Sequence, residues 1–417
     1  MSDNVLHTPP RVGILTFHFA RNYGAVLQCY ALQQTLWALG FNAGVLDYRP
    51  RSIAKGYKVV DIKRFWGRTP SKFLRRTRRE LQVLGSRRRR FASMEAFCQN
   101  HLNFLESGEC DTVVVGSDQV WNPALTEGRM DSRYWGQALE GKHLISYAAS
   151  IENGLQLLKD EQLRPALERF TAVSLREEKA LEKIRELRPD ACLCCDPVLL
   201  TGEGLWKKLA SESHICERLG DYMLYYQVRK SPAGLEMAKR LSAAKGLRLI
   251  CLSAKVEDDN TSEVASASPE DFLALLLGAK FVLTTSFHGC AFSILMHKQF
   301  LALSLGDGRD SRIAGLLQQL GLQSRCISLP ALSAGSSVHS PASAAGSSVH
   351  SDVSSVDFPT PAAGSSVQSP TSADGCLTDS VIEAAARASN AAIDWPSVDC
   401  RLSEISKPSK EYLLKNI

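Results

Sequence analysis

Short apolar segments alternate with amphipathic segments along most of this sequence, and this alternation is the feature that most restricts its fold. Residues 11 to 17 (RVGILTF) predict a strand, residues 20 to 40 place apolar side chains at helical spacing as far as Gly40, and residues 41 to 50 predict a second strand. A strand, a helix and a strand within about 35 residues indicate a βαβ unit, whose two strands are parallel.

The same alternation continues through both halves of the chain. Further strands are predicted near residues 111–121, 143–150, 171–176 and 191–200, and a second series of strands and helices begins at residue 222. Two such series predict an α/β protein with two doubly wound, Rossmann-like domains that face a cleft. The predicted parts are a flexible segment at 1–10, domains at 11–205 and 206–330, an insertion at 331–375, and a helical segment at 376–417 that completes the fold.

The insertion differs in composition from the rest of the chain. AGSSVHS occurs at residues 334–340 and again at 345–351, and AGSSVQS follows at 363–369. A segment rich in Ser, Ala, Pro and Gly buries too little apolar surface to offset the entropy of ordering it, so we expect a disordered surface loop. His339 and His350 belong to this repeat and are given no catalytic role.

Composition restricts the cellular setting. No apolar stretch reaches the roughly 18 residues of a membrane-spanning helix, and the first ten residues do not resemble a secretory signal. Twelve cysteines in 417 residues, mostly among apolar neighbours, favour reduced thiols and a cytoplasmic protein. Cys192, Cys194 and Cys195 are interpreted as thiols of a buried strand, since a metal site would need a matching second pair.

Positive charge is concentrated between residues 63 and 90. Twelve Lys or Arg residues lie there with a single acid, Glu80. One interpretation is a solvated amphipathic helix with an apolar side formed by Phe73, Leu74, Leu81 and Leu84. The other is peripheral contact with the anionic inner face of a membrane or with a lipid-linked substrate. No nucleic-acid motif accompanies the charges, so a nucleic-acid partner is not expected.

Polar residues gather at the predicted carboxyl ends of the strands, where parallel α/β sheets bind ligands. Each also has a structural interpretation: Asn22 as a helix cap, Arg176 as a surface ion-pair partner, and His288 as a satisfied core histidine. The candidate set is Asn22, Tyr23, Gly24, Ser117, Asp118, Arg176, Ser286, His288 and Gly289.

Six segments in order, GILTFHFARNYGAVLQCYALQQTL, VVVGSDQVWNP, ISYAASIE, VSLREEKA, CDPVLL and TTSFHGCAFSILMHKQFLAL, closely resemble the polysaccharide pyruvyl transferase family. The resemblance spans roughly residues 11–328 and the tail after 376. It implies a fold similar to B-type glycosyltransferases. One departure is Glu152, where related sequences usually have glycine.

The resemblance also implies transfer of the enolpyruvyl group of phosphoenolpyruvate onto two sugar hydroxyls as a ketal, with release of phosphate. In that scheme Arg176 holds the donor anion, His288 is the acid/base and Asp118 orients or deprotonates an acceptor hydroxyl. Asn22, Tyr23, Gly24, Ser117, Ser286 and Gly289 would bind substrate. Beyond the donor itself, no cofactor is expected, and no metal site.

Two other classes of function remain open from the sequence. The same fold serves nucleotide-sugar-dependent glycosyltransferases, and a non-catalytic sugar-binding module would keep the fold without the chemistry.

Overall fold

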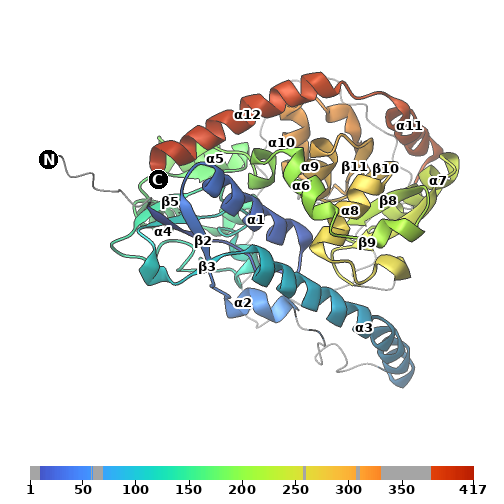
Figure 1. Ribbon diagram of the computed structural model, residues 1–417, viewed down its shortest axis with the longest axis horizontal. Helices are drawn as coiled ribbons and strands as arrows, with labels where there is room; N and C mark the ends of the chain where they lie inside the picture. The colour runs from blue at the N-terminus through green and yellow to red at the C-terminus, as the bar shows by residue number, and fades with distance from the viewer. Residues whose placement is uncertain (1–9, 58, 60–68, 257–259, 307–309, 330–376) are drawn as a thin grey trace, which may run out of the picture.

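Two parallel β-sheets form the framework of the protein in a computed structural model, which describes residues 10–57, 59, 69–256, 260–306, 310–329 and 377–417 (Figure 1). The first sheet has the order β3-β2-β1-β4-β5 and the second the order β12-β11-β10-β8-β9, with every printed pairing parallel. The expected α/β fold with two Rossmann-like halves is confirmed.

We call the half that contains β1 to β7 the N-lobe and the half that contains β8 to β12 the C-lobe. β6 and β7 form a separate pair beside β5. The strands are β1 (Arg11–Leu15), β2 (Asn42–Leu46), β3 (Phe104–Leu105), β4 (Thr112–Val115), β5 (His143–Ser146), β6 (Ser174–Leu175), β7 (Cys192–Leu193), β8 (Tyr222–Gln227), β9 (Arg248–Ser253), β10 (Phe281–Thr284), β11 (Phe300–Ser304) and β12 (Cys326–Ser328).

Helices follow the strands in the order that the sequence predicts. Ser268 caps the start of α8, as the Ser-Pro pair there indicates, and its side chain accepts a hydrogen bond from the Asp271 amide. The helices are α1 (Tyr23–Ala38), α2 (Arg51–Ala54), α3 (Pro70–His101), α4 (Asp160–Leu167), α5 (Glu178–Leu187), α6 (Glu203–Ala210), α7 (Pro232–Ala244), α8 (Pro269–Gly278), α9 (Phe287–Leu295), α10 (Ser311–Gln319), α11 (Asp379–Asn390) and α12 (Trp395–Asn416).

Helix α1 is buried on nearly every side. Thirteen of its sixteen residues are buried, so it is not the one-sided amphipathic helix of a protein surface. Its first residue reaches the C-lobe: Tyr23 stacks on Phe272 of α8 at 4.6 Å between centroids, and the Tyr23 hydroxyl donates to the Ala267 carbonyl at 2.8 Å. A single apolar cluster therefore runs through α1 from one lobe into the other.

Helix α3 contains the part of the basic run that the structure describes. Its N-terminal part extends beyond the two sheets (Figure 1), and Leu74 and Leu81 are 71% and 65% exposed. The predicted apolar side of this helix is thus largely in solvent. Residues 63–68 of the run lie outside the described residues. So do residues 331–375, which the sequence predicts to be a disordered loop, and the description resumes at Leu377.

Two arginines of the basic run are structural. Arg90 is fully buried, and its Nη1 donates to the Ser253 carbonyl of the C-lobe at 2.7 Å. Arg87 pairs with Glu80 at 2.9 Å and also donates to the Val256 carbonyl. These contacts attach α3 to the end of β9. Neither prediction for the basic run, a solvated helix or a ligand-binding surface, included buried arginines.

Helix α12 returns from the C-lobe across both halves to the N-lobe (Figure 1). Near its end the Tyr412 hydroxyl donates to the Ser146 carbonyl at 2.8 Å, and the His143 ring contacts the Asn416 carbonyl at 2.7 Å. Leu413 is fully buried in the shared apolar cluster, whereas the next residue, Leu414, is 53% exposed.

We expect Leu413→Ala to lower the free energy of unfolding by about 2–5 kcal/mol, because it leaves a cavity in a packed core. The matched variant Leu414→Ala, one residue along the same helix, should change it by less than about 0.5 kcal/mol. Urea unfolding followed by circular dichroism measures both. Equal effects of the two substitutions would contradict the packing described for α12.

Candidate active site

A cavity of about 620 Å³ lies between the lobes, at the carboxyl ends of the strands. The N-lobe contributes the loops that follow β1, β4 and β5, and the C-lobe contributes the turns after β8 and β10 together with α10. The predicted residues that line it are Asn22, Asp118, Ser286 and His288. A second cavity of about 490 Å³ adjoins it and is lined by Arg176 and Asp196. Glu152, Phe287 and Arg312 border both cavities.

His288 occupies the second position of α9, next to a tight backbone approach from α1. The Ser286 side chain caps α9 by accepting from the Gly289 amide at 3.3 Å. A Cβ atom built on Gly24 would lie 2.1 Å from His288 Nδ1, so only glycine at position 24 leaves room for the imidazole. The sequence analysis expected this glycine to admit a substrate, and the structure shows that it admits the histidine.

Asp196 faces the other nitrogen of His288. The Nε2 atom lies 3.5 Å from Asp196 Oδ2 and makes no hydrogen bond to any described residue. Burial alone would raise the pKa of Asp196, but the charges of His288 and Arg176 and the Val198 amide hold it well below its ordinary value. Asp196 is therefore a carboxylate, and it faces the imidazole of His288.

Arg176 is held beside the same aspartate. Its Nη1 donates to Asp196 Oδ2, its Nη2 lies 3.7 Å from Asp118 Oδ1, and its guanidinium lies 5.0 Å from the centroid of the Phe287 ring. The side chain is buried, yet Nε and Nη2 make no hydrogen bond to any described residue. Buried donors without an acceptor are costly, so these two N–H groups indicate a place for an anionic ligand.

A second guanidinium lies on the Phe287 ring. Arg312 is 6.0 Å from the ring centroid, and its Nη2 donates to Glu152 Oε1 at 3.1 Å. Arg312 Nε also has no hydrogen-bond partner among the described residues. Glu152 has φ +46°, a left-handed conformation that favours glycine, in agreement with the departure noted in the sequence.

Asp118 and Asn22 each make a hydrogen bond that stabilises the local backbone, and each also borders the first cavity. Asp118 has φ +71°, its carbonyl accepts from the Ser150 amide at 2.9 Å, and its carboxylate reaches the first cavity. Asn22 borders the same cavity, and its Oδ1 caps α1 by accepting from the Gly24 amide at 3.0 Å. The helix-cap interpretation of Asn22 is thus confirmed.

Four predicted substrate-binding residues, Gly24 among them, do not line either cavity. Tyr23 packs between α1 and α8, as described above. Ser117 is fully buried, and its hydroxyl donates to the Ala148 carbonyl at 3.1 Å. Gly289 lies against β10, where a Cβ would come within 2.3 Å of Thr284 Oγ1. In this structure these residues pack around the site, and their role as ligand contacts stays a prediction.

The geometry gives importance to three residues that have no predicted role. Asp196 lies at a predicted strand end, in CDPVLL, where polar residues are expected to gather around a ligand. Phe287 precedes His288 in the same turn, but an aromatic ring between two apolar stretches gave no separate signal. Arg312 lies within an ordinary helical segment, and only the fold brings it to Glu152.

We expect Gly24→Ala to displace the His288 imidazole and to destabilise the protein by about 1–3 kcal/mol, because a methyl group must fit where the ring now lies. Nuclear magnetic resonance of histidine-labelled protein would detect the displaced ring, and urea unfolding would give the stability. Gly204→Ala in α6, where a Cβ meets nothing within 4 Å, is the control and should leave both unchanged. An unperturbed His288 resonance in Gly24→Ala would contradict the geometry.

No curated protein matches the sequence. Similar solved structures include a putative UDP-N-acetylglucosamine 2-epimerase from Listeria monocytogenes (15% identity, 74% of this chain and 83% of that chain covered, TM-score 0.39). Another is a UDP-glucosyltransferase from Polygonum tinctorium (10% identity, 99% of both chains covered, TM-score 0.40). Likenesses at this level say nothing about what this chain does.

The family comparison is more specific. The model of the family described as polysaccharide pyruvyl transferase matches residues 22–307, a span that begins at the Asn22 cap of α1 and extends past His288. It includes Arg176 and Asp196 and exceeds half of the chain. The chain belongs to the polysaccharide pyruvyl transferase family.

Proposed function

We propose that this protein transfers the enolpyruvyl group of phosphoenolpyruvate onto two hydroxyls of a sugar in a polysaccharide or its precursor. The product is a cyclic pyruvate ketal, and phosphate is released. Family membership supports pyruvyl transfer to a saccharide in general. The identity of the donor and the ketal chemistry are the steps that the proposal adds.

The choice of donor rests on two guanidinium groups that lie over the ring of Phe287, a residue that borders both cavities. Arg176 and Arg312 both lie against Phe287, and three of their N–H nitrogens make no hydrogen bond to any described residue. Phosphoenolpyruvate carries a phosphate and a carboxylate, and planar guanidinium groups bind both in a fixed orientation. Two fixed cations thus suit a small donor with two anionic groups.

His288 has the surroundings of an acid/base group. Asp196 faces Nε2 at 3.5 Å, while Nδ1 lies over Gly24, where no side chain intervenes. In the proposed first step His288 gives a proton to the methylene carbon of the donor, which becomes a methyl group. Positive charge then develops on the carbon that bears the phosphate and the carboxylate.

Two sugar hydroxyls complete the ketal. The first forms a C–O bond to this carbon and loses its proton to Asp118, which borders the same cavity. The C–O bond to phosphate then breaks, and the second hydroxyl forms the second bond. Of the two hydroxyl protons, one balances the proton given to the methyl group and the other leaves with phosphate.

We expect His288→Ala to lower kcat for phosphate release from phosphoenolpyruvate by about 100-fold or more, the scale of losing a general acid. Arg176→Lys should instead raise KM for the donor, because an ammonium cannot replace the planar fork. The assay measures phosphate release with a panel of sugar acceptors. His214→Ala, at an exposed histidine that pairs with Glu217, is the control and should retain full activity.

The same panel tests the other classes of function. Turnover only with a nucleotide sugar would contradict the donor assignment and support a glycosyltransferase. Saccharide binding that survives His288→Ala, with no turnover of either donor, would support a binding module. Unchanged kcat in His288→Ala would refute the assigned acid/base role.

The projecting part of α3 suggests where a lipid-linked acceptor is met. No described helix is long and apolar enough to cross a membrane. The N-terminal part of α3 exposes Leu74 and Leu81 beside Arg75, Arg78 and Arg88. Exposed leucines among arginines are typical of a helix that lies on an anionic lipid surface. We include peripheral membrane contact, at the cytoplasmic face, in the proposed function.

We expect the protein to sediment with vesicles that contain anionic lipid and not with neutral vesicles. The double variant Leu74→Asp/Leu81→Asp should lose most of this binding, because it removes the apolar contact and adds repulsion. Leu414→Asp, at an exposed leucine of α12, should bind like the wild type. Equal binding of all three proteins would show that α3 is only a solvated helix.

A further inference from the structure

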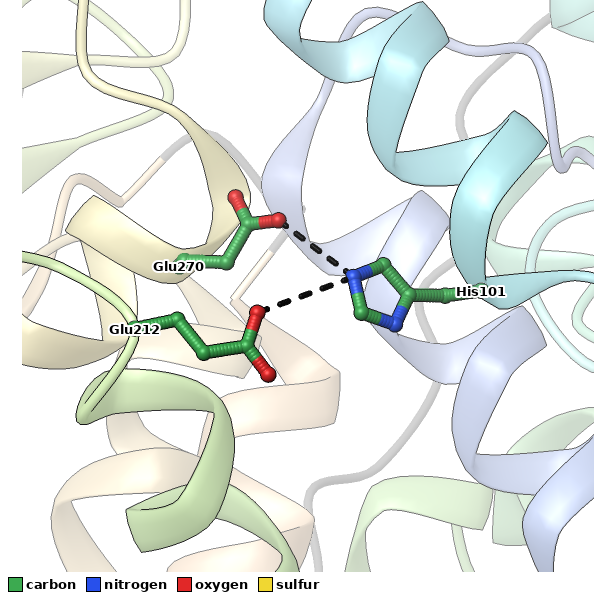
Figure 2. Close-up of side chains that lie close together, drawn as sticks. All are labelled: His101, Glu212 and Glu270. Carbon is green, nitrogen blue, oxygen red and sulfur yellow. Dashed lines mark ion pairs between the residues drawn. The ribbon is translucent and has the colours of Figure 1, made fainter.

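Three side chains that commonly ligate metals meet at the seam between the lobes, outside both cavities. His101 ends α3, Glu212 follows α6, and Glu270 lies in the first turn of α8 (Figure 2). Within the described part of the chain this is the one place where at least three such groups come together. The three residues lie far apart in the sequence, so no ligand spacing could have marked them.

The distances are close to those of a metal site. His101 Nε2 lies 3.5 Å from Glu270 Oε1 and 4.0 Å from Glu212 Oε2, and the three ligand atoms are all within 4.8 Å of one another. Ligands at about 2.0–2.1 Å around a tetrahedral Zn²⁺ are roughly 3.4 Å apart. Glu212 has to move most, and its side chain is 48% exposed, so it has room to do so.

The imidazole is fixed in advance of any ligand. Its ring packs on Phe97 at 4.5 Å and edge-on to Tyr30 at 5.9 Å between centroids. Gln33 of α1 donates to the His101 carbonyl at 2.9 Å and accepts from the Asn103 amide at 2.8 Å, which holds the end of α3. Nε2 therefore points at both carboxylates, as Figure 2 shows, and little entropy is lost when it binds an ion.

Negative charge at this place is not balanced by a basic side chain. Among the described residues neither Glu212 nor Glu270 forms an ion pair with a lysine or arginine, and each carboxylate faces only His101. Two carboxylates that converge on one imidazole, with no described lysine or arginine paired to either, are a place where a divalent cation would offset negative charge.

We propose that His101, Glu212 and Glu270 bind one Zn²⁺ ion, with solvent in the fourth position. One imidazole and two carboxylates are a donor set that Zn²⁺ takes, whereas Mg²⁺ and Ca²⁺ prefer oxygen ligands alone. The ion joins α3 of the N-lobe to α6 and α8 of the C-lobe. Its role is to fasten the lobes together, since none of its ligands borders the cavities.

The test is calorimetric titration of the metal-stripped, full-length protein with Zn²⁺, with Mg²⁺ titrated separately. We expect one equivalent of Zn²⁺ to bind, a rise of the melting temperature by several degrees because the ion binds only the folded state, and no such effect of Mg²⁺. His101→Gln and Glu270→Gln should each weaken binding at least tenfold. His214→Gln, at a solvent-exposed His–Glu pair, should bind like the wild type.

Cysteines are the main competing ligands, so Co²⁺ binding is followed by absorption as well. A Co²⁺ complex without thiolate charge-transfer bands, abolished in His101→Gln, supports the site. Glu212→Gln keeps the test valid if another variant folds poorly, because this half-exposed side chain contacts only solvent and His101 within the cluster. Absence of stoichiometric Zn²⁺ binding, binding that survives all three substitutions, or thiolate bands alone would overturn the proposal.

Discussion

Burial of α1 between the lobes is the constraint on which the rest of the structure depends. Its side chains belong to one apolar cluster that continues into α8, α9 and α12. The start of the helix provides the backbone surface against which His288 lies, and its middle provides Tyr30 and Gln33, which hold His101. Wide separation of the lobes would expose this helix to water at a large hydrophobic cost. The N-lobe therefore determines the position of a histidine that belongs to the C-lobe.

Most of the framework could be predicted from local sequence because parallel α/β folds repeat a simple pattern. Strand and helix alternate, and Ser268, Ser286 and Asn22 cap helices where short polar side chains precede an apolar run. Local patterns could not show which face of a helix packs against another element and which faces solvent. The leucines of α3 have the spacing of a buried stripe but lie in solvent, whereas arginines of the same helix are buried against the C-lobe.

Only part of the candidate site could be predicted from local sequence. Asp118, Arg176 and His288 are candidates because they lie at predicted strand ends, and the structure places Asp118 and His288 at the first cavity and Arg176 at the second. Tyr23 and Ser117 lie at the same strand ends but point into packed regions, Tyr23 against α8 and Ser117 toward the Ala148 carbonyl. Arg312 approaches from α10, so its role depends on tertiary contacts that no local pattern contains.

Electrostatics in this site are those of a closed network rather than of a free cation. Arg176 lies among Asp118, Glu177 and Asp196; burial raises the pKa of Glu177, whereas the nearby positive charges lower the pKa of Asp196. A buried guanidinium with several carboxylates is held in one orientation. An incoming anion meets N–H groups that already point in a fixed direction, at the cost of competing with the carboxylates.

The contact between Glu152 and Arg312 has a consequence for the sequence of events in a two-substrate reaction. Together with Phe287 these residues form the wall between the two chambers, and the carboxylate belongs to one lobe and the guanidinium to the other. A molecule in the first cavity and a molecule in the second cavity can react only past this wall. An anion that takes Arg312 away from Glu152 would open the wall as it binds. Where a glycine replaces Glu152, Arg312 would have no such counter-ion to release, and the order in which donor and acceptor enter would be free of this control.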